Sequence, residues 1–328
     1  MSKTCHVLGI DTSNYKTSVA VADSSGNIVC DIREFLQVKT GERGLRQSDA
    51  LFQHVKMLPV LMERVRGQFS GSFDAVAYSS RPRPADGSYM PVFLAGKCVA
   101  ESISAALGIP VFAYSHQEGH IEAVKAFSPF ADSSEVLACH FSGGTCELLR
   151  AAAVIGLRSH GAGSAYDIEI IGGSHDISFG QVIDRAGVMM GMDFPSGAYM
   201  DRKALAAGYS SKVLTPVKVK DAWINLSGID TQMKNRIEDT AENETDPLIR
   251  ELFERISDAV FRMLVQGAEK TGINRILMAG GVSASRFIRA HTERRARSVG
   301  LELFFDENDL SQDNAVGVAI LGGKEIWG

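Results

Sequence analysis

Two histidines four residues apart, His116 and His120, are the part of this sequence with the clearest capacity for chemistry. On a helix, residues at this spacing project from one face about one turn apart, so both imidazoles can reach one ion. A carboxylate from a distant segment would complete a His, His, Asp set, and residues 311–314 (Ser-Gln-Asp-Asn) carry one. Such a set leaves coordination positions open on iron(II), zinc or manganese. The alternative is a helix whose exposed face happens to carry two histidines.

Three short turns have the composition of phosphate-binding loops. They are residues 11–13 (Asp-Thr-Ser), 142–145 (Ser-Gly-Gly-Thr) and 280–283 (Gly-Gly-Val-Ser). Glycine allows the backbone to approach a ligand closely, and hydroxyl and backbone N–H groups can then face anionic oxygens. A helix that follows such a turn adds its dipole. One turn alone could simply reverse the chain, but all three follow expected strands.

Two further carboxylates are candidates for binding hydroxyl groups. Asp184 lies in the segment 180–185 and Asp201 in the segment 193–202, which includes Pro195-Ser196-Gly197. A carboxylate can accept hydrogen bonds from the paired hydroxyls of a ribose or from a threonine-like hydroxyl. The alternative is that Asp184-Arg185 is a surface helix pair and Pro195-Ser196-Gly197 a simple loop.

Hydrophobic periodicity predicts the elements that must position these residues. The helix at 47–65 is expected to bury Leu51, Val55, Leu58 and Met62 on one face. Strands are predicted at 6–11, 17–23, from 28, at 73–79, 111–114, 136–141, 147–151, 275–279 and 301–305. Helices are predicted at 47–65, 91–107, over the histidine pair, at 178–191, 198–207, 247–271, 283–299 and from 312.

The two halves of this pattern are similar. Each begins with a strand, a tight turn and a second strand, and later alternates strands with helices. This weak internal duplication predicts two α/β domains flanking a cleft. The periodicity stops at residues 128–134, which places the domains at 1–131, with the histidine pair, and at 132–328, with a final helix that supplies Asp313.

Composition narrows the class of protein. The 328 residues are 45% hydrophobic and 22% charged, with a net charge of −5, which argues against a generally basic surface that coats nucleic acid. The arginines of residues 286–297 are more typical of a solvated helix face. No segment approaches about 18 consecutive apolar residues, so we expect no membrane partner. A signal-peptide profile is absent, and five scattered cysteines without a C-x-x-C pair predict reduced thiols, mostly in the core, and a cytoplasmic protein.

Taken together, the motifs resemble those of the TsaD/Gcp family, over nearly the whole length. This family installs threonylcarbamoyl on the adenosine beside the anticodon of certain tRNAs, and was formerly labelled O-sialoglycoprotein endopeptidase, peptidase M22. The matching motifs, in order, are Gly9-Ile10-Asp11-Thr12-Ser13, His116-Gln117-Glu118-Gly119-His120, Phe141-Ser142-Gly143-Gly144, Asp184 with Pro195-Ser196-Gly197, Asn225-Leu226-Ser227-Gly228, Ala279-Gly280-Gly281-Val282-Ser283-Ala284 and Asp313-Asn314-Ala315.

The resemblance implies an actin-like ATPase fold, with two domains of the sugar kinase, Hsp70 and actin (ASKHA) type around a central cleft. It implies one divalent metal, Fe²⁺ or Zn²⁺, held by His116, His120 and Asp313, and an adenine nucleotide or threonylcarbamoyl-adenylate as the second ligand. It further implies tRNA and related TsaB-like and TsaE-like subunits as partners. The candidate nucleotide-binding residues are Asp11, Ser13, His140, Phe141, Ser142, Gly143, Gly144, Asp184, Gly197, Asp201, Gly280, Gly281 and Ser285.

The chain departs from the family pattern on the nucleotide side. The family continues after Asp11-Thr12-Ser13 with Cys-Asp-Glu-Thr, where this chain has residues 14–17 as Asn-Tyr-Lys-Thr and so loses both acids. Residues 81–84, Arg-Pro-Arg-Pro, replace a Gly-Pro-Gly loop. Thr145 follows Gly144 directly, without the usual histidine between them, Ser285 stands where the family has asparagine, and Ser196 replaces the first of two glycines. These departures predict a divergent paralogue.

The expected activity is metal-dependent transfer of threonylcarbamoyl from its adenylate to N6 of a tRNA adenosine, an acyl transfer of the N6-L-threonylcarbamoyladenine synthase type. No side chain beyond the metal ligands is assigned to catalysis, because no Ser/His/Asp or Cys/His arrangement is evident and the H-x-x-x-H motif lacks the glutamate placement of H-E-x-x-H. Two alternatives remain: a non-catalytic paralogue that binds metal and nucleotide and regulates a related complex, and carbamoyl transfer to a small-molecule acceptor.

Overall fold

The computed structural model describes residues 4–13, 15–38, 45–154, 164–239, 245–306 and 309–327, and the chain divides into two compact units. Unit 1 consists of Met1–Asp132, Ala152–Asp167 and Asn308–Gly328; unit 2 consists of Ser133–Ala151 and Ile168–Glu307. The predicted division into 1–131 and 132–328 therefore differs from the structure in two segments. Residues 152–167 and 308–328, the latter with Asp313, belong to unit 1.

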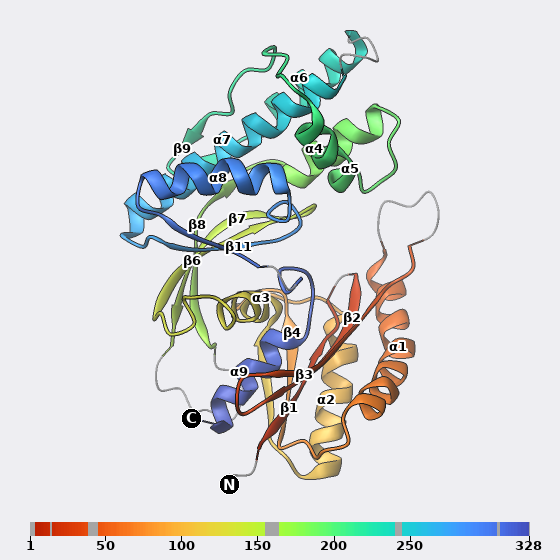
Figure 1. Ribbon diagram of the computed structural model, residues 1–328. Helices are drawn as coiled ribbons and strands as arrows, with labels where there is room; N and C mark the ends of the chain where they lie inside the picture. The colour runs from red at the N-terminus through yellow and green to blue at the C-terminus, as the bar shows by residue number, and fades with distance from the viewer. Residues whose placement is uncertain are drawn as a thin grey trace. The chain divides into compact units, whose positions relative to one another are not determined.

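Unit 1 is built on a five-stranded sheet with the order β3-β2-β1-β4-β5 (Figure 1). β1 pairs antiparallel with β2 and parallel with β4, so the N-terminal hairpin leads into a parallel region of the sheet. The strands are β1 His6–Asp11, β2 Lys16–Asp23, β3 Ile28–Phe35, β4 Ala75–Arg81 and β5 Val111–Ser115; the helices are α1 Gln47–Gln68, α2 Phe93–Leu107, α3 His116–Lys125 and α9 Val316–Trp327.

Successive residues of β1 face opposite sides of this sheet, as the period of two in a strand requires. Leu8 and Ile10 lie in a core that also contains residues of α1 and α2. Gly9 faces the other side, where an added Cβ would come within 2.4 Å of the Ala315 carbonyl oxygen and 2.8 Å of Ala319 Cβ. Helices α1 and α2 therefore cover one face of the sheet, and α9 covers the other.

Two glycines allow α3 and α9 to cross at very close range. A Cβ at Gly317 would lie 1.8 Å from the Gly119 carbonyl oxygen, and one at Gly119 would lie 3.1 Å from Val318 Cγ1. Any side chain at Gly317 would separate the two backbones. Because Gly119 lies between His116 and His120, this contact brings the start of α9 beside the histidine pair.

Unit 2 contains a seven-stranded sheet with the order β12-β11-β6-β7-β8-β10-β9. Within it, β6 and β11 are parallel neighbours, with His140 paired to Ala279. The strands are β6 Glu135–Phe141, β7 Cys146–Ala153, β8 Tyr166–Ser174, β9 Val219–Lys220, β10 Trp223–Ile224, β11 Arg275–Ala279 and β12 Glu302–Phe305; the helices are α4 Phe179–Met189, α5 Gly197–Ala206, α6 Ser227–Asp239, α7 Thr245–Thr271 and α8 Arg286–Ser298.

The structure confirms every predicted strand and helix in outline and corrects three details. Val55 is 54% exposed, and the buried face of α1 runs instead through His54, Leu58 and Leu61. The last helix begins at Val316, not at residue 312, so Asp313 lies in the loop before it. Strands β8, β9 and β10 and helix α6 were not predicted.

Cysteine placement follows the expectation of core thiols only in part. Cys30, Cys139 and Cys146 are buried, whereas Cys98 on α2 is exposed. No helix in the described residues combines the length and the apolar character needed to cross a membrane.

Candidate metal centre and glycine turns

The histidine helix α3 begins immediately after β5 and is fixed by a capping box. The Ser115 hydroxyl accepts a hydrogen bond from the Glu118 N–H (3.2 Å), and the Glu118 carboxylate accepts one from the Ser115 N–H (2.7 Å). Reciprocal caps of this kind satisfy backbone donors that a helix start otherwise leaves open. The first turn, which carries His116, therefore has a defined backbone position.

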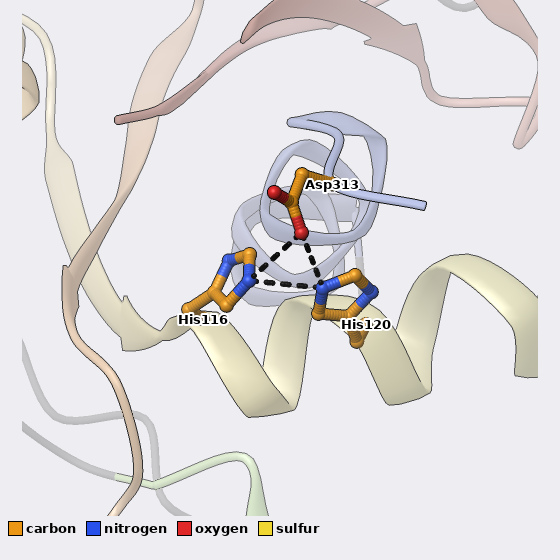
Figure 2. A group of neighbouring side chains, drawn as sticks. All are labelled: His116, His120 and Asp313. Atoms are coloured by element: carbon orange, nitrogen blue, oxygen red, sulfur yellow. Dashed lines mark hydrogen bonds and ion pairs between the residues drawn. The ribbon is translucent and has the colours of Figure 1, made fainter. Parts of the chain in front are cut away.

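His116, His120 and Asp313 converge on one point in unit 1, as Figure 2 shows. The Nε2 atoms of the two histidines are 2.9 Å apart. Oδ1 of Asp313 lies 3.2 Å from Nε2 of His120 and 3.4 Å from Nε2 of His116. The structure thus brings together the three residues that the sequence assigned to a metal.

The spacing of these three atoms suits a bound ion. Ligand atoms at about 2.1 Å from a metal lie about 3.0–3.4 Å from one another in octahedral or tetrahedral geometry. The three observed separations are 2.9, 3.2 and 3.4 Å. Two imidazole nitrogens and one carboxylate oxygen are ligands that zinc and iron(II) accept, with further positions left open. The residues present therefore fit a divalent metal.

Asp11, predicted as a nucleotide-binding residue, instead contacts the histidine pair. It ends β1, is 1% exposed, and its Oδ2 lies 2.8 Å from Nδ1 of His116. Its carboxylate also accepts hydrogen bonds from the Ser79 hydroxyl and from the Ser13 N–H. With Nδ1–H directed to Asp11, Nε2 of His116 faces His120 and Asp313. A carboxylate in this position fixes the tautomer and orientation of a metal-ligating histidine.

Burial and the neighbouring charges determine the protonation states of His116, His120 and Asp313. Burial alone would lower the pKa of His116, but the carboxylates of Asp11 and Asp313 outweigh it and raise that pKa to about 10. Burial and the neighbouring His116 charge lower the pKa of His120. Burial would raise the pKa of Asp313, but its hydrogen bonds to the two histidines hold it well below its usual value. Without metal, His116 is thus a cation between two carboxylates.

The N-terminal departures from the family pattern also lie in unit 1. Lys16 is buried and Tyr15 is 41% exposed, while Asn14 lies outside the described residues. The carbonyl of Pro82, in the altered 81–84 loop, accepts a hydrogen bond from the Gln117 N–H (3.0 Å). Lys16 also donates a hydrogen bond to Gln312, the neighbour of Asp313, so each altered segment contacts a residue adjacent to a proposed metal ligand.

The other two glycine turns meet in unit 2 because they follow neighbouring parallel strands. The turn 142–145 follows β6, and the turn 280–283 follows β11. Gly280 has φ +91°, and its Cβ would lie 2.3 Å from the Phe141 carbonyl oxygen. That oxygen accepts the Val282 N–H at 2.9 Å. The carboxyl ends of parallel strands are where α/β proteins bind ligands.

Within these turns, glycine serves two different purposes. A Cβ at Gly143, Gly144 or Gly281 would meet nothing within 4 Å, so the backbone there is open to an approaching ligand. Gly280, in contrast, is required by its positive φ and by packing. Phe141, predicted as a binding residue, is 1% exposed and packs edge-on against Phe179. Its side chain therefore belongs to the core.

The hydroxyl of Ser142 stabilises its own turn, and α4 supports the turn from outside. Ser142 Oγ accepts hydrogen bonds from the Gly144 N–H (3.3 Å) and the Thr145 N–H (3.0 Å). Ser178, the N-cap of α4, donates to the Gly143 carbonyl at 2.8 Å. His140, on β6 before the turn, is half-buried.

The two carboxylates predicted to bind hydroxyls differ in the structure. Asp184 on α4 accepts the Ser196 N–H at 2.8 Å, next to Gly197 at the start of α5, and burial raises its pKa. Asp201 accepts from the Ser285 hydroxyl (2.5 Å) and from the N–H groups of residues 286 and 287. Both oxygens of Asp201 thus hold the N-terminus of α8, and the Ser285 hydroxyl caps the same helix.

Sequence comparisons agree with this arrangement. The model of the TsaD family, tRNA N6-adenosine threonylcarbamoyltransferase, matches residues 37–320. A tRNA N6-adenosine threonylcarbamoyltransferase of Neorickettsia sennetsu is 27% identical over 319 residues, which cover 95% of this chain and 91% of that protein. One from Aromatoleum aromaticum is 27% identical over 333 residues, with 96% and 90% covered.

Solved structures show the fold. Component A of (R)-2-hydroxyglutaryl-CoA dehydratase from Acidaminococcus fermentans has a TM-score of 0.55 at 13% identity, covering 98% of each chain. Full-length HypF has a TM-score of 0.60 at 13% identity, covering 99% of this chain and 47% of that one. A ROK-family glucokinase from Streptomyces griseus has a TM-score of 0.51 at 14% identity, with 97% and 99% covered. The chain has the actin-like ATPase fold, as the sequence predicted.

Proposed function

The chain belongs to the TsaD family of tRNA N6-adenosine threonylcarbamoyltransferases, and from that premise we propose that it transfers threonylcarbamoyl from threonylcarbamoyl-adenylate to N6 of a tRNA adenosine. In this reaction the N6 nitrogen forms a bond to the carbamoyl carbon. The bond from that carbon to the phosphate oxygen breaks, AMP leaves, and the nitrogen loses a proton. Convergence of His116, His120 and Asp313 is the observation that carries the proposal.

We propose that these three residues hold a divalent metal, Fe²⁺ or Zn²⁺. An ion bound there would supply Lewis-acid polarisation of a carbonyl oxygen. Asp11 orients the His116 ring through a hydrogen bond to the Nδ1 atom of that ring, so that Nε2 is directed toward the proposed metal position. The remaining contribution of these side chains is placement of the reacting group rather than covalent catalysis.

On the nucleotide side, we propose that the backbone at Gly143, Gly144 and Gly281 faces the adenylate phosphate. The open space around these glycines, and their location after two adjacent parallel strands, support this assignment. Asp184 on α4, together with Gly197 at the start of α5, is proposed to lie near the ribose. The Asp201 carboxylate and the Phe141 ring are engaged within unit 2 and are not part of the proposed nucleotide site.

We propose that the protein acts in the cytoplasm with tRNA and with related TsaB-like and TsaE-like subunits. The loss of the two acids at residues 15 and 16 supports slow transfer that depends on these partners.

The decisive experiment supplies purified, metal-loaded protein with threonylcarbamoyl-adenylate and unmodified tRNA, with and without the partner subunits. Modified nucleoside is measured by mass spectrometry after digestion of the tRNA, and AMP release is measured in parallel. We expect slow formation of modified nucleoside that increases with the partners. His116→Ala/His120→Ala should abolish both signals while the variant remains folded by circular dichroism.

Two results would contradict the proposal. Binding of metal and nucleotide without transfer under any partner condition would identify a non-catalytic paralogue. AMP release stimulated by a small-molecule amine but not by tRNA would identify a different acceptor.

A further inference from the structure

The three proposed metal ligands are held by different kinds of structure. His116 and His120 lie on the capped helix α3, whereas Asp313 lies in the irregular segment 309–315 before α9. A loop residue needs side-chain contacts to hold its position. We propose that Lys16, reaching from β2, is a positioning residue that holds this loop so that Asp313 stays at the histidine pair. This inference rests on the proposed metal site.

Lys16 contacts the residue next to the ligand. Its side chain is 5% exposed, and Nζ donates to Oε1 of Gln312 at 2.5 Å. The ammonium group also lies 4.5 Å from the centroid of the Phe35 ring. Phe35 is the residue paired with Lys16 across β2 and β3, so the sheet itself places the ring against the cation. Lys16 is therefore held on two sides.

Arg33 provides a second attachment a few residues earlier in the same loop. Its Nη1 donates to the Asp309 carbonyl oxygen at 2.6 Å, while Asp31 holds the guanidinium through Nε at 3.0 Å. Gln312 Nε2 donates to the Asp309 carboxylate, which joins the two attachment points. Two cations of the β2–β3 hairpin thus contact the segment 309–312, immediately before Asp313.

On the other side of the ligand, Asn314 connects the loop to α9. Its Nδ2 donates to the carbonyls of Leu310 (2.8 Å) and Gln312 (2.7 Å), and its Oδ1 accepts the Val316 N–H (2.9 Å). Asp313 therefore lies between a residue bound by Lys16 and a residue that caps the helix. These contacts restrain the backbone on both sides of Asp313.

The charge of Lys16 is opposite to that of the residue in the family pattern described above. Where the family pattern has glutamate, a carboxylate could not donate a hydrogen bond to Gln312 Oε1. The lysine thus forms a contact that the usual residue would not form in this way. Groups that are hydrogen-bonded directly to a metal ligand typically alter metal affinity by about 10- to 100-fold when they are removed. Lys16 contacts the residue next to the ligand, so we expect an effect at the lower end of this range.

The test compares Lys16→Met with Lys56→Met. Lys56 is exposed on α1 and lies over another phenylalanine ring, that of Phe52, at 5.4 Å, so it is a matched control away from the loop. Hydrogen exchange of amides 309–317 is measured in the metal-free protein, and Zn²⁺ affinity by competition with a chromophoric chelator. We expect Lys16→Met to accelerate exchange and to weaken Zn²⁺ binding about tenfold, and Lys56→Met to change neither.

A second variant, Gln312→Met, tests whether the two residues act together. If they do, Lys16→Met/Gln312→Met should weaken Zn²⁺ binding no more than either single change. Unchanged exchange and affinity in Lys16→Met would overturn the inference. Tighter Zn²⁺ binding would also overturn it, because Lys16 would then act as a competing cation beside Asp313. Absence of metal binding in the wild type would instead contradict the proposed function, while the exchange measurement still decides whether Lys16 holds the loop.

Discussion

The orientation of the His116 ring, and hence the direction of its Nε2 atom, is set by a carboxylate that contacts the other ring nitrogen. Asp11 reaches Nδ1 from the end of β1, and no spacing rule links a residue at position 11 with one at position 116. The sequence indicated Asp11 as part of a turn and as a candidate nucleotide-binding residue. Its observed contact gives it a different role, in which it sets the direction of a neighbouring ligand.

Replacing Asp11 by asparagine should therefore weaken metal binding without removing a ligand. We expect about a 10- to 100-fold loss of Zn²⁺ affinity, because the amide no longer fixes the His116 tautomer. Competition with a chelator measures the change. Asp49→Asn, at an exposed position in the first turn of α1, should have no effect. Equal affinities in the two variants would remove Asp11 from the metal centre.

The charge on His116 predicts proton release on metal binding. The raised pKa of about 10 means that His116 carries its proton at pH 8. A metal needs the nitrogen lone pair, so binding must displace about one proton. Affinity should accordingly fall as the pH falls from 10 to 7. Calorimetry at pH 8 in buffers of different ionisation enthalpy measures the number of protons released, and a heat independent of the buffer would contradict this assignment.

At the scale of elements, the crossing of α3 and α9 determines where the third ligand lies. The sequence pattern predicted both helices. It could not predict their contact, because close approach depends on two glycines nearly 200 positions apart in the chain. The same limitation applies to Asp201, whose carboxylate holds the start of a helix that follows it by more than 80 residues.

Gly317→Ala tests the crossing directly. The added methyl group would lie 1.8 Å from the Gly119 carbonyl oxygen, so the helices must separate. We expect a loss of about 1–3 kcal/mol in the free energy of unfolding, together with weaker Zn²⁺ binding. Gly67→Ala in α1, where a Cβ meets nothing within 4 Å, should be neutral or stabilise by about 0.5–1 kcal/mol. Denaturant unfolding compares the variants, and unchanged stability in Gly317→Ala would contradict the described packing.

For the whole molecule, the two proposed ligands are assigned to different units. The metal centre draws on unit 1 alone, and the glycine turns after β6 and β11 belong to unit 2. The sequence predicted two α/β domains but assigned Asp313 to the second. The error has a physical cause, because long-range packing decides to which unit a segment belongs. Helix α9 packs on one face of the unit 1 sheet, although it follows all of unit 2 in the sequence.

Substitutions in the two units should consequently affect different ligands. Gly143→Val should weaken binding of AMP about 10- to 100-fold, consistent with the loss of one charge-assisted hydrogen bond of about 1.5–3 kcal/mol, and leave Zn²⁺ binding unchanged. His116→Ala/His120→Ala should show the opposite result. Gly208→Val, also in unit 2 and also with open space around its Cβ, is the control. Calorimetry measures both ligands, and an unchanged affinity of Gly143→Val for AMP would exclude this turn from the nucleotide site.

The position of α9 in unit 1 also has a consequence for how the protein is made. One face of the β1–β4 region is covered only when α9, which begins at residue 316, has been synthesised, and the ligand set requires residue 313. On the ribosome, the histidine pair emerges long before its carboxylate partner, so the ligand set is complete only after residue 313 has been synthesised. A nascent chain that has not yet exposed α9 presents an uncovered apolar sheet face, and transiently exposed apolar surface of this kind makes a folding chain prone to aggregation.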